Sequence, residues 1–210
     1  YSINSYMKRK IMNDNSFSNW DVAIIIYIFV AIGSLIPTIL AILKKVQLNP
    51  DGYGYDKSTY FSEEGKQKLI QHYSRIDGTL GYWKNQAEKY RRFNNYTLFY
   101  TIAVSIIIPV ISQQIGEGNS NLFLTIISTH IALIVGFHKG YKVEKNYQSF
   151  RIAESTFFDL RRELLDMPEN FGKGEKEQID NFIQQVRIMR KNARKAEVDN
   201  TPTVSDGKNT

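Results

Sequence analysis

The 210-residue sequence predicts an all-α membrane protein. We expect a transmembrane helical hairpin, an additional N-terminal transmembrane helix and a cytoplasmic bundle of amphipathic helices. Three observations predict this class. Three blocks are apolar and carry no charged side chain, other segments repeat their apolar residues at intervals of three and four, and Lys and Arg are distributed unevenly among the segments that flank the blocks.

The first apolar block covers residues 22–43 and follows an N-terminal flank at 1–21. A helix of about 22 residues is about 33 Å long, enough to cross a hydrocarbon core of about 30 Å. Pro37 is tolerated there, because neighbouring helices can satisfy the carbonyl group that it frees. A signal peptide has a shorter apolar region and a small-residue cleavage site, so a retained transmembrane helix is predicted.

The second and third blocks, residues 96–112 and 122–137, are each just short of a full span. Two buried helices of a soluble core are therefore the alternative. Uncharged amide side chains extend both blocks, and the short, turn-like QQIGEGNSN connects them. These features favour a membrane hairpin.

The distribution of basic residues predicts the topology. Lys and Arg number three in 1–21, ten in 44–95, none in 113–121 and fourteen in 138–210. The positive-inside rule places 44–95 and 138–210 in the cytoplasm and the hairpin tip outside. Three spans then put the N-terminus outside, although KRK at 8–10 argues for the opposite orientation. The basic flanks KYRR (89–92) and HKGYK (138–142) are expected at the lipid surface, which attracts them when it is anionic.

Residues 44–62 contain the turn signal NPDG and a stretch rich in Tyr and Gly. A loop or a small irregular cap is predicted. An amphipathic helix follows at 63–93, with Ser62 as its N-cap. The helix is expected to continue into the second apolar block.

A heptad seam runs along this helix, with intervals of four and three between apolar residues. The heptad seam consists of Leu69, Tyr73, Ile76, Leu80, Trp83, Ala87 and Tyr90. Gly78 and Gly81 lie within it and are interpreted as a bend or a close helix crossing. The same spacing recurs in predicted helices at 140–167, ended by Pro168, and at 175–196, and a disordered tail is predicted at 197–210. The seams can join helices of one subunit, neighbouring subunits, or both.

A polar stripe marks one face of each hairpin helix. Its members are Thr97, Thr101, Ser105 and Ser112 on the first helix and Thr125, Thr129 and Gly136 on the second. Small residues and hydroxyls at these steps are typical of close helix packing. The functional interpretation is that one stripe lines a narrow polar path in an oligomer, with Pro109 as a kink that gates it.

His130 is the one ionisable residue within the three blocks, and such residues are often functional. The structural interpretation is a neutral histidine that is hydrogen-bonded to a hydroxyl group across the hairpin. The alternative is a proton sensor.

No catalytic, cofactor-binding or metal-binding motif is present. The sequence contains no cysteine and only three histidines, which do not form an HExxH pair. It also contains no GxGxxG, GxxxxGK[ST] or GxSxG. We therefore predict no enzyme activity, no cofactor and no metal. Basic and acidic residues are interleaved, as in RRELLDMPE, which argues against nucleic-acid binding.

The order of the predicted helices resembles that of a known protein family. The aromatic and basic helix YWKNQAEKYRRFNNY enters the hairpin, YQSFRIAESTFFDLRRELL leaves it, and IDNFIQQVRIMRKNARKA closes the unit. This order resembles the SLATT family, the SMODS- and SLOG-associating two-transmembrane effector domains of bacterial conflict systems, over about residues 63–196. The block at 22–43 departs from the two-span pattern of that family.

The resemblance implies a homo-oligomeric effector in the bacterial inner membrane. Such an effector would form a pore or depolarise the membrane during anti-phage defence, triggered by a sensor protein that is linked to a nucleotide signal and encoded in the same operon. It supplies no catalytic residue. No nucleotide-sensing domain is visible, and the first residue is Tyr rather than Met, which is compatible with a fragment or a processed product. The alternative function is a non-conducting membrane scaffold or regulatory subunit that anchors a partner protein.

Overall fold

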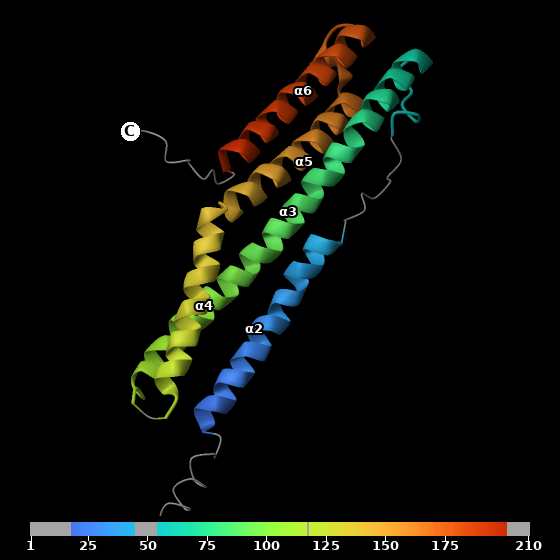
Figure 1. The fold of residues 1–210 in the computed structure, drawn as a ribbon. Helices are drawn as coiled ribbons and strands as arrows, with labels where there is room; N and C mark the ends of the chain where they lie inside the picture. Colours follow the sequence, from blue (N-terminus) through green and yellow to red (C-terminus); the bar gives the residue numbers. More distant parts are fainter. Residues whose placement is uncertain (1–17, 45–53, 117, 201–210) are drawn as a thin grey trace, which may run out of the picture. The chain divides into compact units, whose positions relative to one another are not determined.

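A computed structural model describes residues 18–44, 54–116 and 118–200. Within these ranges the chain is all-helical and contains no strand. The helices are α2 (Asn19–Leu43), α3 (Glu63–Ser112), α4 (Ser120–Gly140), α5 (Val143–Asp166), the 3₁₀ helix η1 (Pro168–Phe171) and α6 (Glu175–Asn200), as labelled in Figure 1. The predicted all-α class is thereby confirmed.

Three of these helices are long and apolar enough to cross a membrane: α2, α3 through its C-terminal part, and α4. The prediction of three apolar spans is therefore confirmed, which is the signature of a multi-pass membrane protein. In the most apolar window of α2 only 6% of the residues are buried inside the chain. Such exposure is unfavourable in water and ordinary in lipid, so it supports the membrane interpretation over a soluble core.

The chain divides into two compact units. The hairpin unit comprises Tyr1–Ile36 and Tyr96–Gly136, and the bundle unit comprises Pro37–Asn95 and Phe137–Thr210. The 50-residue helix α3 contributes to both, because no break separates its charged and apolar parts. The heptad seam and the hairpin segment thus belong to one helix, as the sequence suggested.

The core of the bundle unit lies between α3, α5 and α6. All members of the heptad seam except Tyr90 are buried, and Tyr90 packs against the core half-buried. Phe157 of α5 and Phe182 of α6 are fully buried and face this seam. Burying such a side chain stabilises a fold by roughly 1.5–3 kcal/mol. The heptad seam therefore packs within one chain, and a contact between subunits needs another surface.

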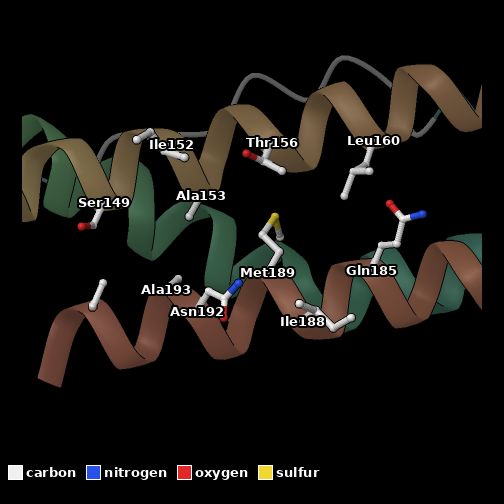
Figure 2. A pocket seen from close by; sticks show the side chains of 11 residues that line it. Ser149, Ile152, Ala153, Thr156, Leu160, Gln185, Ile188, Met189, Asn192 and Ala193 are labelled. Carbon is white, nitrogen blue, oxygen red and sulfur yellow. The ribbon is translucent and has the colours of Figure 1, made fainter. Parts of the chain in front are cut away.

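A groove lies between the antiparallel helices α5 and α6 of the bundle unit (Figure 2). It has a volume of about 490 Å³. Ile152 and Leu160 of α5 face Ile188 and Met189 of α6 across it. Ile152 is 63% exposed and Ile188 is 52% exposed, so the groove presents apolar surface.

Residues 54–62 form a small irregular cap, one of the two structures predicted for 44–62; residues 45–53 of that region lie outside the described residues. The cap has no helix, but Tyr55 and Phe61 insert into the core. The Arg161 guanidinium lies 5.3 Å from the centre of the Tyr55 ring and 5.6 Å from that of Tyr73. Burial raises the pKa of Tyr55, with Arg161 acting in the opposite direction, so the phenol stays neutral.

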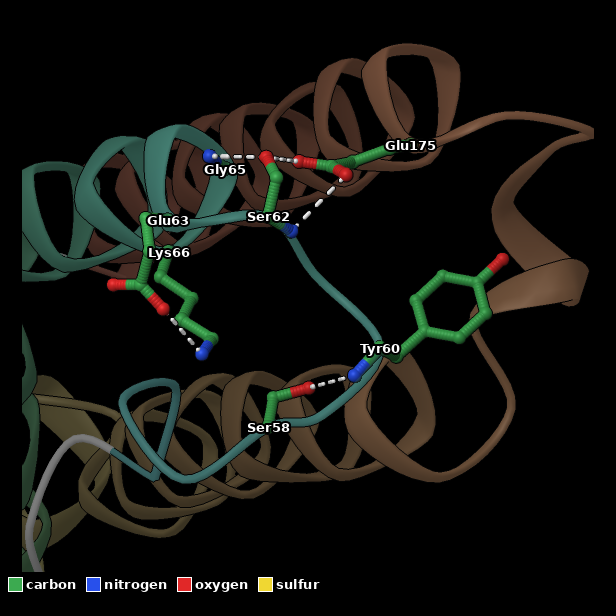
Figure 3. Close-up of polar contacts among 7 residues, drawn as sticks. All are labelled: Ser58, Tyr60, Ser62, Glu63, Gly65, Lys66 and Glu175. Atoms are coloured by element: carbon green, nitrogen blue, oxygen red, sulfur yellow. Dashed lines mark hydrogen bonds and ion pairs between the residues drawn. The ribbon is translucent and has the colours of Figure 1, made fainter.

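Ser62 is the N-cap of α3, as predicted. Its hydroxyl accepts a hydrogen bond from the Gly65 N–H at 3.2 Å, and α3 begins at the next residue, Glu63. The Ser62 hydroxyl and backbone N–H both donate to the Glu175 carboxylate, at 2.5 and 3.1 Å (Figure 3). This carboxylate ties the start of α3 to the start of α6.

Two glycines of α3 should respond oppositely to alanine. A Cβ at Gly65 would overlap the Glu175 carboxylate and crowd Ile179, whereas a Cβ at Gly78 would meet no atom within 4 Å. Gly78 therefore marks no close helix crossing. We expect Gly65→Ala to destabilise the bundle by about 1 kcal/mol, because the Ser62–Glu175 bonds must shift. Gly78→Ala should stabilise it by up to about 1 kcal/mol.

The measurement for this glycine pair is thermal unfolding of the full chain in detergent, followed by circular dichroism. Each variant controls for the other, since both replace a glycine of the same helix by alanine. Melting temperatures that rise equally in both variants would contradict the close contact at Gly65.

Two predicted boundaries were wrong. The helix predicted at 140–167 begins at Val143, because Lys142 adopts a left-handed conformation (φ 45°) that separates it from α4. The predicted tail loses its first four residues, since α6 continues to Asn200. Glu197 accepts a 2.5 Å hydrogen bond from Tyr82 of α3, and Asn200 is buried, so tertiary contacts extend the helix. The rest of that tail, 201–210, lies outside the described residues.

Candidate functional site: a histidine and tyrosine cluster in the hairpin unit

A polar cluster joins the three helices of the hairpin unit around His130 of α4. The Tyr27 hydroxyl of α2 lies 2.6 Å from His130 Nδ1, and the Tyr96 hydroxyl of α3 lies 2.9 Å from His130 Nε2. Tyr100, one turn after Tyr96, stacks its edge against the imidazole with ring centres 4.9 Å apart. We call Tyr27, Tyr96, Tyr100 and His130 the histidine cluster.

A further hydrogen bond extends the cluster along α2. The Tyr100 hydroxyl lies 2.8 Å from the Ser34 hydroxyl, which in turn lies 2.7 Å from the Val30 carbonyl oxygen of its own helix. Tyr96 is 7% exposed and Tyr100 is 2% exposed, so both are shielded within the unit. Their apolar rings fill space, while their hydroxyls supply partners that lipid could not.

The chemistry of the histidine cluster follows from the two nitrogens of imidazole. In neutral histidine one nitrogen donates a hydrogen bond and the other accepts one, so one tyrosine hydroxyl accepts and the other donates. Both tautomers satisfy this arrangement. A protonated ring would donate to both tyrosines. The cluster can therefore hold three helices together and can also hold a proton.

Apolar contacts surround the cluster. Ile24 of α2, Val104 and Ile111 of α3, and Phe123 and Ile127 of α4 form the buried core of the hairpin unit. These residues occupy the faces that the helices turn toward one another. The polar stripe does not belong to this core.

The structure exposes most of the polar stripe. Only Thr97 is buried, while Thr101, Ser105, Ser112, Thr125, Thr129 and Gly136 are exposed. Gly136 has no atom within 4 Å of the position that a Cβ would occupy. These six exposed residues therefore do not mediate close packing within the chain, whereas Thr97 is packed inside it.

Four of the stripe hydroxyls donate to carbonyl groups of their own helix. Thr101 donates to the Thr97 carbonyl at 2.8 Å, Ser105 to that of Ile102 at 2.7 Å, and Ser112 to that of Pro109 at 2.8 Å. Thr125 does the same toward Asn121 at 2.8 Å. Such back-bonding satisfies the donor and leaves oxygen lone pairs facing outward. A helix that carries this stripe can face lipid or line a polar path.

Pro109 lies within α3, which continues to Ser112. The position is exposed and is followed by less than one further turn of helix. A kink at a proline moves the part of the helix that follows it, and here that part has only three residues. This short segment argues against Pro109 as a gating kink.

The start of α2 and the hairpin tip lie together. The Asn119 amide donates a 2.5 Å hydrogen bond to Asp21, and the Trp20 and Phe123 rings are 5.9 Å apart. Both contacts are internal to the hairpin unit. The first turn of α2 and the hairpin tip therefore lie at the same end of the hairpin unit.

Sequence reasoning identified His130 but missed its tyrosine partners. Tyr96 and Tyr100 are spaced by four, and Tyr27 is the one tyrosine inside the first apolar block. Tyrosine near the end of a span is usually assigned to the membrane interface, which concealed this signal. Among the described residues, no group of three or more His, Asp or Glu side chains is placed to hold a metal ion.

No protein-family model, curated protein or solved structure matches this chain. The resemblance to the SLATT family thus depends on the order of the predicted elements alone.

Proposed function

We propose that this chain is a membrane effector of a bacterial anti-phage or conflict system. In this proposal it lies in the inner membrane, with the bundle unit in the cytoplasm and the N-terminal flank outside. Copies of the chain assemble and open a polar path through the bilayer when a partner sensor, linked to a nucleotide signal, is triggered. The resulting ion flow depolarises the cell.

The observation that supports a polar path is the exposure of Thr101 and Ser105. Both lie on a face of α3 that the hairpin unit leaves uncovered, and both direct their protons to backbone carbonyls. Around a shared axis, their outward lone pairs would offer acceptors to a permeating cation. The second hairpin helix, whose Thr125 and Thr129 are likewise exposed, is the alternative wall of the path.

The coupling in this proposal runs along α3. A signal that shifts the packing of the heptad seam moves the same helix that carries Thr101 and Ser105. The junction at 89–95 lies between the two and contains no glycine or proline. A continuous helix transmits rotation or translation without a hinge.

The test of the pore is a double substitution of the stripe. We expect triggered cells that express the natural chain to lose their membrane potential and to admit a small dye. Thr101→Leu with Ser105→Leu should abolish both signals, because it removes the acceptors and narrows the path. The matched control is Ile102→Leu with Ile106→Leu, which changes exposed neighbours one residue along and should leave the signals intact.

The membrane potential and the entry of a small dye are measured in bacteria that express the chain with and without its neighbouring genes. A membrane fraction first verifies that the protein is in the membrane. Intact potential in every condition would contradict the pore. That outcome would favour the non-conducting scaffold, for which the satisfied hydroxyls of the stripe are equally suitable, because they can face lipid.

The proposed topology has its own test, which the absence of cysteine makes direct. Single cysteines at Asn19, in the first turn of α2, and Gln114, at the hairpin tip, should react with a membrane-impermeant maleimide in intact spheroplasts. Gln184→Cys on α6 should react at least about tenfold less until detergent is added, because an ionic reagent does not cross the hydrocarbon core. Labelling of Gln184→Cys but not Gln114→Cys would contradict the orientation.

A further inference from the structure

A second polar site lies in the bundle unit, between α3 and α5. It is a pocket of about 430 Å³. Its lining residues are Lys84, Ala87, Glu88 and Arg91 of α3 and Tyr147, Arg151 and Glu154 of α5. Three cationic side chains thus converge with two carboxylates and one phenol. Neither the histidine cluster nor the polar stripe uses any of them.

The carboxylates hold the arginines in place. Arg151 Nη1 lies 2.7 Å from Glu154, whose side chain is only 8% exposed, and Arg91 Nη2 lies 2.8 Å from Glu88. Burial opposes ionisation of Glu88, but hydrogen bonds from Arg91 and Arg92 outweigh it and lower the pKa of the Glu88 carboxyl. A guanidinium has five N–H donors, so one ion pair leaves donors that can reach a ligand.

The arrangement suits an oxyanion with several acceptor oxygens. Two arginines that are each paired with a carboxylate can each present a fork of donors, and a phosphate group has enough oxygens to accept from both forks, whereas a carboxylate has only two. Lys84 adds a third positive charge. With Lys84, Arg91 and Arg151 positive and Glu88 and Glu154 negative, the pocket carries a net charge of about +1.

The position of the pocket along α3 indicates where the phosphate comes from. Arg91 precedes Tyr96, the first residue of the apolar part of α3, by five residues, or about 7.5 Å along a helix. The polar layer of a bilayer is about 5–7.5 Å thick on each side. Arg91 therefore lies at the depth of lipid phosphates if the apolar part of α3 spans the hydrocarbon core.

We propose that this pocket binds a phosphate ester, namely the headgroup of an anionic phospholipid, between α3 and α5. The headgroup would bridge the helix that enters the hairpin and the first helix that follows it. This site depends on the membrane location of α3 but not on the proposed pore.

A matched pair of arginines tests the proposal. Arg91 and Arg92 are neighbours, are 48% and 46% exposed, and both pair with Glu88, yet only Arg91 lines the pocket. The full chain is purified in detergent, and binding of phosphatidylglycerol is measured by native mass spectrometry. We expect Arg91→Gln to weaken binding about tenfold or more, and Arg92→Gln by less than about twofold.

Both variants leave Glu88 with one arginine partner, so a loss of folding is not expected, and circular dichroism verifies this. Glycerol 3-phosphate and inorganic phosphate form the comparison arms. Competition by glycerol 3-phosphate, with the same dependence on Arg91, would support recognition of the phosphate ester. Binding of the soluble phosphates without phosphatidylglycerol would overturn the lipid assignment. Equal weakening by both variants, or no binding to the natural chain, would overturn the site.

Discussion

Replacing Leu80 by asparagine is expected to destabilise the bundle unit by roughly 3–5 kcal/mol. Leu80 is fully buried in the heptad seam of α3. The loss of a buried leucine side chain costs roughly 2–5 kcal/mol, and an unpaired buried amide adds about 1–3 kcal/mol. Partial relaxation of the core and exposure of the amide to water reduce the sum to the expected range.

The two tryptophans make this effect measurable in the bundle alone. In a Trp20→Phe background, Trp83 is the one remaining tryptophan, and it is 2% exposed within the same core. Its emission should shift to the red at lower temperature in Leu80→Asn. The control is Asp77→Asn, which installs the same side chain at an exposed position of α3 and should stay within about 0.5 kcal/mol. Equal melting of the two variants would contradict the burial of the seam.

The same variant probes the coupling between seam and stripe. If a signal reaches the membrane through the seam, a loosened seam should change both the assembly and the toxicity of the effector. Unchanged toxicity and assembly in Leu80→Asn, with its emission shifted as expected, would separate the bundle from the gating mechanism.

Replacing His130 by phenylalanine is expected to loosen α2 from the hairpin, at a cost of roughly 2–4 kcal/mol. Phenylalanine retains an aromatic ring of similar size but removes both nitrogens, so Tyr27 and Tyr96 lose the hydrogen bonds that they make to His130. Each buried polar group that loses a bond in this way costs about 1–3 kcal/mol.

Thermal unfolding in detergent and hydrogen exchange of residues 22–36 measure the loosening. Leu133→Phe is the control, because Leu133 lies one turn further along α4, is 56% exposed and lies outside the cluster. It should melt as the natural chain does. Equal protection of α2 from hydrogen exchange in the natural chain, His130→Phe and Leu133→Phe would contradict the role of His130 as a link between helices.

The proton-sensing hypothesis has a separate readout. If His130 senses protons, depolarisation should depend on pH in the natural chain, and His130→Phe should remove that dependence. The groups that face the imidazole are tyrosines from α2 and α3, and no carboxylate belongs to the cluster. An identical pH profile in both proteins would leave His130 with a structural role alone.

The sequence was most informative where one segment decides its own conformation. The three apolar helices follow from length and the lack of charge, because the bilayer thickness sets both. Ser62 as the N-cap follows from its place before two acidic residues, since capping is local. The heptad seam follows from spacing, because a helix places every third or fourth residue on one face.

The tertiary structure alone decided which faces meet. Tyr27 and His130 are separated by 103 positions, so no local pattern pairs them. The polar stripe has the spacing of a packing face, yet the helices turn Val104 and Ile127 inward and leave Thr101 and Ser105 exposed. Periodicity defines a stripe but not its rotation about the helix axis, which depends on the summed contacts of all neighbouring helices. The pocket at Arg91 and Arg151 likewise exists only because α3 and α5 bring two ordinary charged faces together.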